Sequence, residues 1–182
     1  MKQTQLLFKA FDRESKKDFG GTGRTGAKGN PRERRPISVK RPMHLVMRSS
    51  IAVGEKSFLR TRYAKRIEEF IRRSALENGV KIYRYANSGN HLHLLVMPRS
   101  RDAFNAFSRV VTGLIARVIL GAEKGQGKGV KFWDARPFSR ILEWGRKFKI
   151  VSDYLLKTTL ESLGFIPFVR RRNGKIVPKR LP

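Results

Sequence analysis

The order of sequence patterns along the chain predicts an α+β fold, namely a ferredoxin-like βαββαβ antiparallel sheet with an added C-terminal helix. Short apolar runs typical of strands alternate with longer segments of helical periodicity. Two of these runs flank the tight turn Asn87-Ser88-Gly89, which predicts a β-hairpin. In this arrangement the first and third strands are central neighbours, and the two main helices cover one face of the sheet.

The first part of the pattern predicts one strand and one helix. Residues 43–48 alternate between apolar and polar side chains, as a strand with one buried face does. Residues 59–78 have the apolar period of a helix, which we expect to end at Gly79. The apolar face of this helix comprises Leu59, Tyr63, Ile67, Phe70 and Ile71.

The second part predicts the hairpin, another helix, a fourth strand and the added helix. Residues 80–86 and 90–97 are the hairpin strands, and Asp102 is expected to cap the helix that follows. Residues 138–142 predict the fourth strand and residues 146–163 the last helix. The helix after Asp102 is expected to turn its apolar side chains toward the core. These are Phe104, Phe107, Val111, Leu114, Ile115 and Val118.

Basic residues dominate the composition, with 41 Lys and Arg against 14 Asp and Glu and a formal net charge of +27 in 182 residues. Such an excess predicts a polyanionic partner, and nucleic acid fits best. No apolar run approaches the roughly 18 residues of a spanning helix, and no secretory pattern begins the chain, so we expect no membrane contact. The absence of cysteine excludes disulfides and agrees with a cytoplasmic location.

Composition also divides the chain into three parts. Residues 1–41 form a basic, glycine-rich arm that we expect to be flexible, residues 42–164 the core domain, and residues 165–182 a basic tail containing Arg170, Arg171 and Arg172. We expect both ends to bind phosphate groups of nucleic acid. The alternative is that they are solvated ends that only keep the protein soluble.

The strand at residues 90–97 carries His91 and His93, whose side chains share one face because strand residues alternate between faces. Two neutral imidazoles at this spacing can hold a divalent metal. The alternative is a pair of polar residues on an exposed sheet face. The third histidine of the chain, His44, either assists this site or is a polar residue near a strand end.

Tyr154 lies in the middle of the last predicted helix. Phe148, Val151 and Leu155 share an apolar face that can pack on the sheet, and Tyr154 and Thr158 belong to the adjoining stripe. The tyrosine can therefore look back over the histidine face and serve as a nucleophile. A packing residue with its hydroxyl at the rim is the alternative.

These blocks resemble a known family. Residues 90–95 resemble the Asn-His-hydrophobic-His signature of the HUH nucleases, and residues 41 to 166 resemble their single-tyrosine branch, the bacterial insertion-sequence transposases that include the REP-associated tyrosine transposases. Residues 43–48 are similar to the family's first strand, and residues 132–141 resemble its Trp-rich turn into the fourth strand. Residues 154–165 are similar to its tyrosine helix.

The resemblance implies a DNA transposase that cleaves and rejoins single-stranded DNA. The tyrosine of such enzymes attacks a phosphodiester, forms a 5′-phosphotyrosine bond and releases a 3′-hydroxyl, so that no ATP is needed. In this chain Tyr154 would be the nucleophile, and His91 and His93 would be ligands of Mg²⁺ or Mn²⁺. The partner would be single-stranded or hairpin DNA. The protein would act as a monomer or a homodimer in the bacterial cytoplasm, associated with the nucleoid.

The third metal ligand departs from the family pattern. Relatives often place a carboxylate or an amide one turn after the tyrosine, where this chain has Thr158, which is a weak ligand. Glu161 is nearly two turns away from the tyrosine, and Asp153 is expected to point to another side. Thr158 is therefore the candidate third ligand, and a weakened or domesticated enzyme is the alternative.

Further DNA-binding candidates lie near strand ends, where a DNA strand would cross the active face. They are Arg48, Trp133, Arg136 and Arg140. Trp133 would stack on unpaired bases, with burial in the core as an equal alternative.

Two other functions are open at this point. The first is a non-catalytic DNA- or RNA-binding module on the same fold. The second is a replication-initiator or relaxase-type HUH nuclease, although such enzymes usually carry larger accessory domains.

Overall fold

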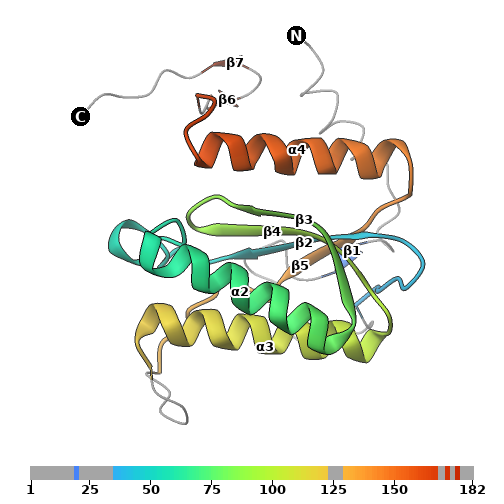
Figure 1. Cartoon of the computed structure of the whole chain (residues 1–182), viewed down its shortest axis with the longest axis horizontal. Coiled ribbons are helices and arrows are strands. Elements are labelled where there is room, and N and C mark those ends of the chain that lie inside the picture. The colour runs from blue at the N-terminus through green and yellow to red at the C-terminus, as the bar shows by residue number, and fades with distance from the viewer. Residues whose placement is uncertain (1–18, 21–34, 123–128, 168–170, 173–174, 177–182) are drawn as a thin grey trace.

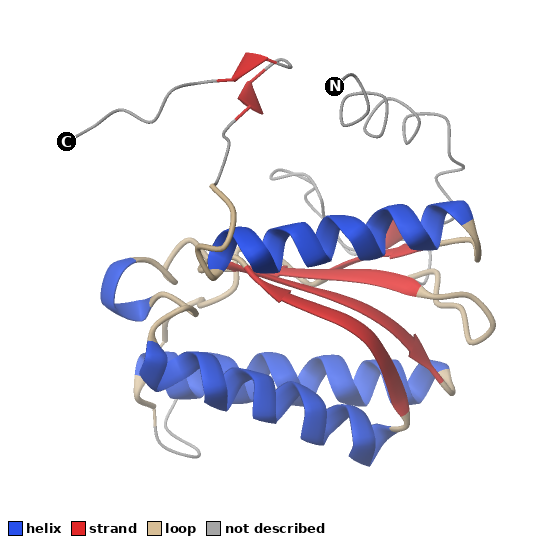
Figure 2. Cartoon of the chain, turned by 45° about the horizontal axis from the view of Figure 1, so that its top comes forward, coloured by secondary structure: helices blue, strands red, loops and turns tan. Residues whose placement is uncertain are grey.

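The protein is represented by a computed structural model that describes residues 19–20, 35–122, 129–167, 171–172 and 175–176. Its main feature is an antiparallel sheet between two layers of helices (Figure 1, Figure 2). Two helices cover one face of the sheet, and a third helix lies across the other face (Figure 2).

The sheet has the strand order β1-β5-β2-β4-β3. Its main strands are β2 (Met43–Arg48), β3 (Val80–Asn87), β4 (His91–Pro98) and β5 (Phe138–Ile141), and all neighbours are antiparallel. Because β2 and β4 are the central pair, the predicted ferredoxin-like βαββαβ topology is confirmed. The short β1 (Phe19–Gly20), within the predicted N-terminal arm, extends the sheet beside β5 and was not predicted.

Helix α2 (Thr61–Asn78) follows a short 3₁₀ helix, η2 (Gly54–Lys56). The prediction that α2 begins at Leu59 is wrong: this side chain precedes the helix and is 41% exposed. The predicted end at Gly79 is confirmed, with φ +64°. The left-handed backbone angle favours glycine at this position, and a Cβ atom there would lie 2.5 Å from Cδ of the Arg99 side chain, which would have to move aside.

Helix α3 (Arg101–Leu120) is capped by Ser100, whose hydroxyl accepts a hydrogen bond from the Ala103 amide at 3.0 Å. The predicted cap, Asp102, is wrong because it lies in the first helical turn, while Ser100 has the extended backbone of a capping residue. Helices α2 and α3 form the main core with the sheet. Its largest fully buried side chains include Phe58, Phe104, Phe107, Met43, Leu45, Ile67, Leu92 and Leu94.

By length and composition, α3 could cross a membrane, contrary to the expectation that the chain has no such segment. It nevertheless has the burial pattern of a core helix. Phe104, Phe107, Val111 and Ile115 are buried in the main core against the sheet and α2.

Helix α4 (Arg146–Ser162) covers the opposite face of the sheet (Figure 2). A second, smaller core joins it to the strands and comprises Ala86, Leu95, Leu142, Val151 and Leu155. The predicted apolar face of this helix is therefore confirmed. It holds α4 against the strand that carries the two neighbouring histidines.

The two predicted tails are described only in part. At the end of the N-terminal arm, Lys40 O accepts a hydrogen bond from Trp144 Nε1 at 3.0 Å, and Arg35 O accepts one from Arg101 at 2.9 Å. These residues thus contact the core domain. In the C-terminal tail, β6 (Arg171–Arg172) pairs with β7 (Lys175–Ile176). The rest of both tails lies outside the described residues.

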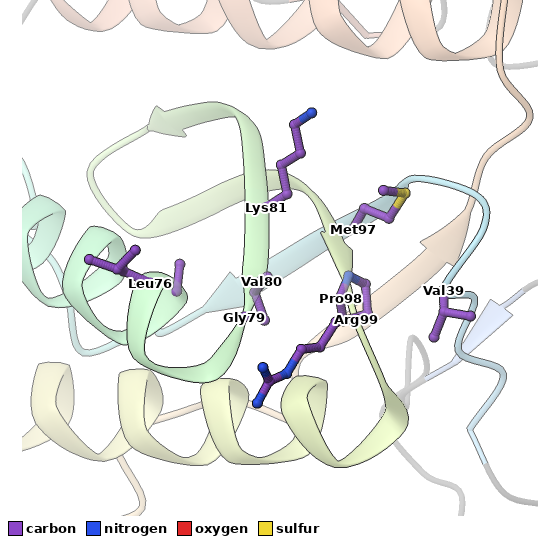
Figure 3. Close-up of a pocket in the computed structure, with 9 residues that line it drawn as sticks. Val39, Leu76, Gly79, Val80, Lys81, Met97, Pro98 and Arg99 are labelled. Carbon is purple, nitrogen blue, oxygen red and sulfur yellow. The ribbon is translucent and has the colours of Figure 1, made fainter.

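A shallow hollow of about 350 Å³ lies where α2 ends and β3 begins (Figure 3). Leu76, Val80, Met97 and Arg99 are among its lining residues. This hollow is at the opposite end of β4 from His91. It is therefore separate from the histidine site.

Candidate active site

All three histidines lie on the face of the sheet that α4 covers. In the central pair, Arg48 is opposite His91, Val46 is opposite His93, and His44 is opposite Leu95, a member of the core under α4. Leu45 and Leu94, one residue away, enter the main core on the other face. The open question about His44 is thereby answered: it faces the same side as the histidine pair.

His93 is at the centre of this group. Its ring stacks on the His44 ring at 5.5 Å between centroids and on the His91 ring at 6.0 Å. The Tyr154 ring meets it edge-on at 5.9 Å. His93 is only 9% exposed, whereas Tyr154 is 43% exposed, so the tyrosine lies over the buried histidine at a position that solvent reaches.

Each member of the histidine pair has a partner at its Nδ1 atom. His91 Nδ1 lies 2.6 Å from Asn90 Oδ1, an acceptor, so His91 donates from Nδ1 and its Nε2 keeps a lone pair. His93 Nδ1 lies 3.3 Å from His44 Nε2. An imidazole with its proton on Nδ1 can bind a cation through Nε2.

The surroundings keep these rings neutral. Burial, followed by the charges of His93 and Arg140, lowers the pKa of His44 to about 3. Burial, followed by the charge of His91, lowers the pKa of His93 to about 4. The pKa of His91 is also lowered, mainly by burial and then by Arg48. All three are therefore in the form that can donate an electron pair to a metal at neutral pH.

His91 and His93 fit a divalent cation, but as a two-ligand site. Throughout the described part of the chain there is no group of three or more His, Cys, Asp or Glu side chains close enough to hold a metal. The Thr158 hydroxyl, the candidate third ligand, is buried and donates to the Tyr154 carbonyl at 3.0 Å. Glu161 pairs with Lys157 at 3.7 Å. Oxygen atoms of a substrate phosphate and water would have to complete the coordination.

Asp134 is a neighbour of this site that the sequence analysis missed. Its carboxylate accepts hydrogen bonds from the Ser50 amide at 2.7 Å and hydroxyl at 2.8 Å, and pairs with Arg48 Nε at 3.2 Å. Burial raises its pKa, but the Ser50 hydrogen bonds and the charges of Arg48 and His91 outweigh this and hold the pKa below its ordinary value. Its sequence signal is that it is the only acidic residue between positions 124 and 142.

The predicted DNA-binding residues differ in their accessibility. Arg48, opposite His91, and Arg136 are exposed. Arg140 is 7% exposed and lies opposite His44 on β5. Trp133 packs against the core, and its Nε1 donates to the Thr112 carbonyl at 3.0 Å, so its position does not favour base stacking. Arg170 and the side chains of Arg171 and Arg172 lie outside the described residues.

A ferredoxin-like sheet with paired histidines on a central strand, covered by a helix that brings a tyrosine over them, is the arrangement that the resemblance to single-tyrosine transposases implied. The family model described as "Transposase IS200 like" matches residues 40–157, and the chain belongs to this family. The chain is thus a member of a family of DNA transposition enzymes. No curated protein matches the chain.

Two solved structures are similar to this one. The structure of a REP-associated tyrosine transposase bound to a REP hairpin has a TM-score of 0.53 and 14% sequence identity, covering 75% of this chain and 74% of that chain. A crystal structure described as a transposase from Deinococcus radiodurans R1 has a TM-score of 0.40 and 16% identity, covering 64% of this chain and 89% of that chain. At such identity the first likeness supports the fold.

Proposed function

We propose that this protein cleaves and rejoins single-stranded DNA through a covalent 5′-phosphotyrosine bond at Tyr154. The observation that carries the proposal is the edge contact between Tyr154 and His93, at 5.9 Å between ring centroids. This contact brings the only tyrosine of α4 beside the histidine pair, of which His93 is buried. The chain belongs to a transposase family, and transposition requires DNA to be cut and rejoined, which supports this proposal.

The reaction exchanges one phosphoester bond for another. The Tyr154 phenol loses its proton to solvent, and its oxygen forms a bond to the phosphorus atom while the bond from phosphorus to the 3′ oxygen breaks. The departing 3′ oxygen keeps the bonding electron pair and takes up a proton. Rejoining is the reverse attack by a 3′-hydroxyl, so the bond energy is conserved and no nucleotide triphosphate is required.

His91 and His93 would hold the divalent cation, Mg²⁺ or Mn²⁺. When bound, such a cation polarises a non-bridging phosphate oxygen and orients the phosphodiester. The two residues act as neutral nitrogen ligands, which favour Mn²⁺ more than Mg²⁺. Asn90 orients the first imidazole through its hydrogen bond to Nδ1.

The proposed substrate is single-stranded DNA that carries a hairpin. The net charge of +27 supplies the attraction to a polyanion. Arg48, exposed and paired with Asp134 beside His91, is positioned to contact a phosphate near the site. The structural relative with a TM-score of 0.53 is bound to a REP hairpin, which supports this choice of substrate.

Tyr154→Phe tests the nucleophile directly. Labelled oligonucleotides with short hairpins, incubated with Mn²⁺ or EDTA and resolved on denaturing gels, should give a protein-DNA adduct only with metal. The variant should lose the adduct entirely and keep its DNA affinity within about threefold, because the ring and its packing stay.

Tyr83→Phe is the matched control for that experiment. Tyr83 also packs under α4, and its hydroxyl donates to Met97 Sδ at 3.8 Å, away from the nucleophile. The control should form adduct at the wild-type rate. An adduct that persists in the Tyr154 variant would rule out this nucleophile, and absence of adduct for every hairpin tried would rule out the catalytic proposal.

A non-catalytic DNA-binding module is the second candidate, favoured by one observation. The Thr158 hydroxyl donates to its own helix and offers no carboxylate or amide to a metal. Hairpin binding without any adduct would support this candidate. The family match favours a transposase over the replication-initiator alternative.

A further inference from the structure

His44 is a partly buried histidine for which the proposed reaction has no use. It lies on β2, opposite Leu95 on one side and Arg140 on the other, in the centre of the sheet. Its ring is stacked on His93 with an interplanar angle of 19°, and its Nε2 is 3.3 Å from His93 Nδ1. The contact is between side chains of two different strands, so it is a feature of the tertiary fold.

One proton lies between these two nitrogen atoms, and its position decides what His93 can do. If His93 Nδ1 donates, then His93 Nε2 carries a lone pair and can bind a cation. If His44 Nε2 donates instead, the proton of neutral His93 is on Nε2 and blocks that atom. A ligand histidine needs the first arrangement, and a fixed acceptor at Nδ1 supplies it.

We propose that His44 is a positioning residue, whose Nε2 accepts the hydrogen bond from His93 Nδ1 and so presents the unprotonated Nε2 of His93 to a divalent cation. This inference rests on the proposed function, because the tautomer of His93 matters only if His93 is a metal ligand. It adds a role for a residue that the paired-histidine motif does not contain.

The neighbouring histidine has a matching arrangement, which supports the inference. His91 Nδ1 meets the amide oxygen of Asn90 at 2.6 Å, an acceptor from the adjacent residue. His93 has no such neighbour in sequence, since Leu92 and Leu94 face the main core. Its acceptor therefore comes from the neighbouring strand.

The environment of His44 suits an acceptor. Arg140, itself 7% exposed, lies opposite His44 on β5, and its positive charge disfavours a second proton on the imidazole. The His44 side chain is partly buried, and its ring lies against that of His93. A direct ligand role for His44 is less suitable, because its Nε2 already faces His93 Nδ1.

The first test measures the tautomer in the full-length protein without metal. Long-range ¹H–¹⁵N spectra of the histidine rings, recorded in EDTA near neutral pH, should show His93 protonated at Nδ1 and unprotonated at Nε2. In His44→Phe, which keeps a ring and loses the acceptor, a substantial fraction of His93 should shift to the Nε2-protonated form. Wild-type His93 protonated at Nε2 would overturn the proposal.

The second test measures Mn²⁺ binding by calorimetry or electron paramagnetic resonance. His44→Phe should weaken the affinity by about 10- to 100-fold, the usual effect of losing the partner of a ligand histidine. His44→Gln, whose side-chain oxygen can replace the Nε2 acceptor, should remain within about threefold of wild type. Tyr83→Phe serves as the control and should bind as wild type.

These measurements separate the inference from the proposed function. Wild-type affinity in His44→Phe, or equal losses in the Phe and Gln variants, would overturn the positioning role. So would an equal loss in Tyr83→Phe, which would indicate a general disturbance under α4. Normal Mn²⁺ binding with no DNA adduct would overturn the proposed reaction alone, whereas a wild-type protein that binds no Mn²⁺ would overturn both.

Discussion

At the residue scale, His93 connects the parts of the site. It contacts His44 across the central strand pair, His91 along its own strand, and Tyr154 on α4. Its burial keeps it neutral, and its location under the tyrosine explains why a metal held there would be close to the proposed nucleophile. At the edge of the site, the Asp134 carboxylate holds the positively charged guanidinium group of Arg48 by an ion pair.

The lowered pKa values of His44 and His93 predict a stability that falls on acidification. Their folded pKa values, about 3 for His44 and about 4 for His93, lie below the ordinary 6.5, so the unfolded chain binds more protons in this range. Stability is therefore complete above about pH 6.5 and lost as the pH falls toward 4. We expect a decrease of about 1.5 to 3 kcal/mol between roughly pH 6.5 and 5.

Urea denaturation in EDTA measures this dependence. The double variant His44→Phe/His93→Phe should have a clearly flatter profile over the same range, because both shifted groups are gone. A wild-type profile as flat as that of the double variant would contradict the prediction.

Asp134→Asn should slow adduct formation several-fold, with DNA affinity within about twofold of wild type. The amide can still accept from Ser50, but it no longer holds the Arg48 guanidinium by charge, and loss of orientation affects rate more than binding. Single-turnover adduct formation and binding in EDTA measure the two effects. Glu68→Gln, which removes the surface pair with Arg72 on α2, is the charge-matched control. Equal rates in Asp134→Asn and this control would contradict the expected role.

At the element scale, two helices position the site in different ways. Helix α3 supports the sheet from beneath through the main core, and α4 brings the tyrosine over it from the other side. Leu155, next to the tyrosine, is fully buried against the strands, while Tyr154 remains at the rim. The same helix therefore both packs and presents a reactive group.

Ser100→Ala should destabilise the protein by about 1 kcal/mol, because the hydroxyl that caps α3 is lost. Asp102→Ala, in the exposed first turn, should change the free energy of unfolding by no more than about 0.5 kcal/mol. Equilibrium denaturation of both variants measures the difference. A larger loss of stability for Asp102→Ala than for Ser100→Ala would indicate that Asp102 is the cap.

At the scale of the whole molecule, charge and shape act together. The fold buries two apolar cores on the two faces of one sheet. The whole chain has 41 basic and 14 acidic residues, and Arg48 and Arg136 are among the basic residues exposed to solvent. The two cores give a packed scaffold, and the net positive charge gives a strong general attraction to nucleic acid.

The affinity for single-stranded DNA should therefore depend steeply on salt. If the protein contacts roughly six phosphates, the dissociation constant should rise about 10²- to 10³-fold between roughly 50 and 200 mM salt. Fluorescence anisotropy with a labelled hairpin measures this. An uncharged peptide nucleic acid of the same sequence is the control and should show little dependence. A flat response for DNA would show that phosphate contacts contribute little.

The sequence by itself determined the topology, because strand and helix periods are local properties that alternate clearly here. It also determined the shared face of His91 and His93, since neighbours at i and i+2 in a strand share a face. The apolar face of α4 followed from its helical spacing, which also brought Tyr154 toward the sheet. The cap of α3 was assigned two residues too late, because Ser100 and Asp102 are both good capping residues and only backbone geometry separates them.

Only the tertiary structure decided what the long-range contacts bring together. The partnership of His44 with His93, 49 positions apart, depends on the register in which β2 pairs with β4. Asp134 contacts both Arg48 and Ser50, and it lies 84 positions after Ser50 in the sequence. These contacts depend on a loop that meets the end of a strand. The sequence likewise left open whether Trp133 stacks on bases or packs in the core. In the structure its Nε1 donates to the carbonyl of Thr112 in α3. Local periodicity fixes which face a side chain takes, but strand pairing and helix packing fix which other side chain it meets there.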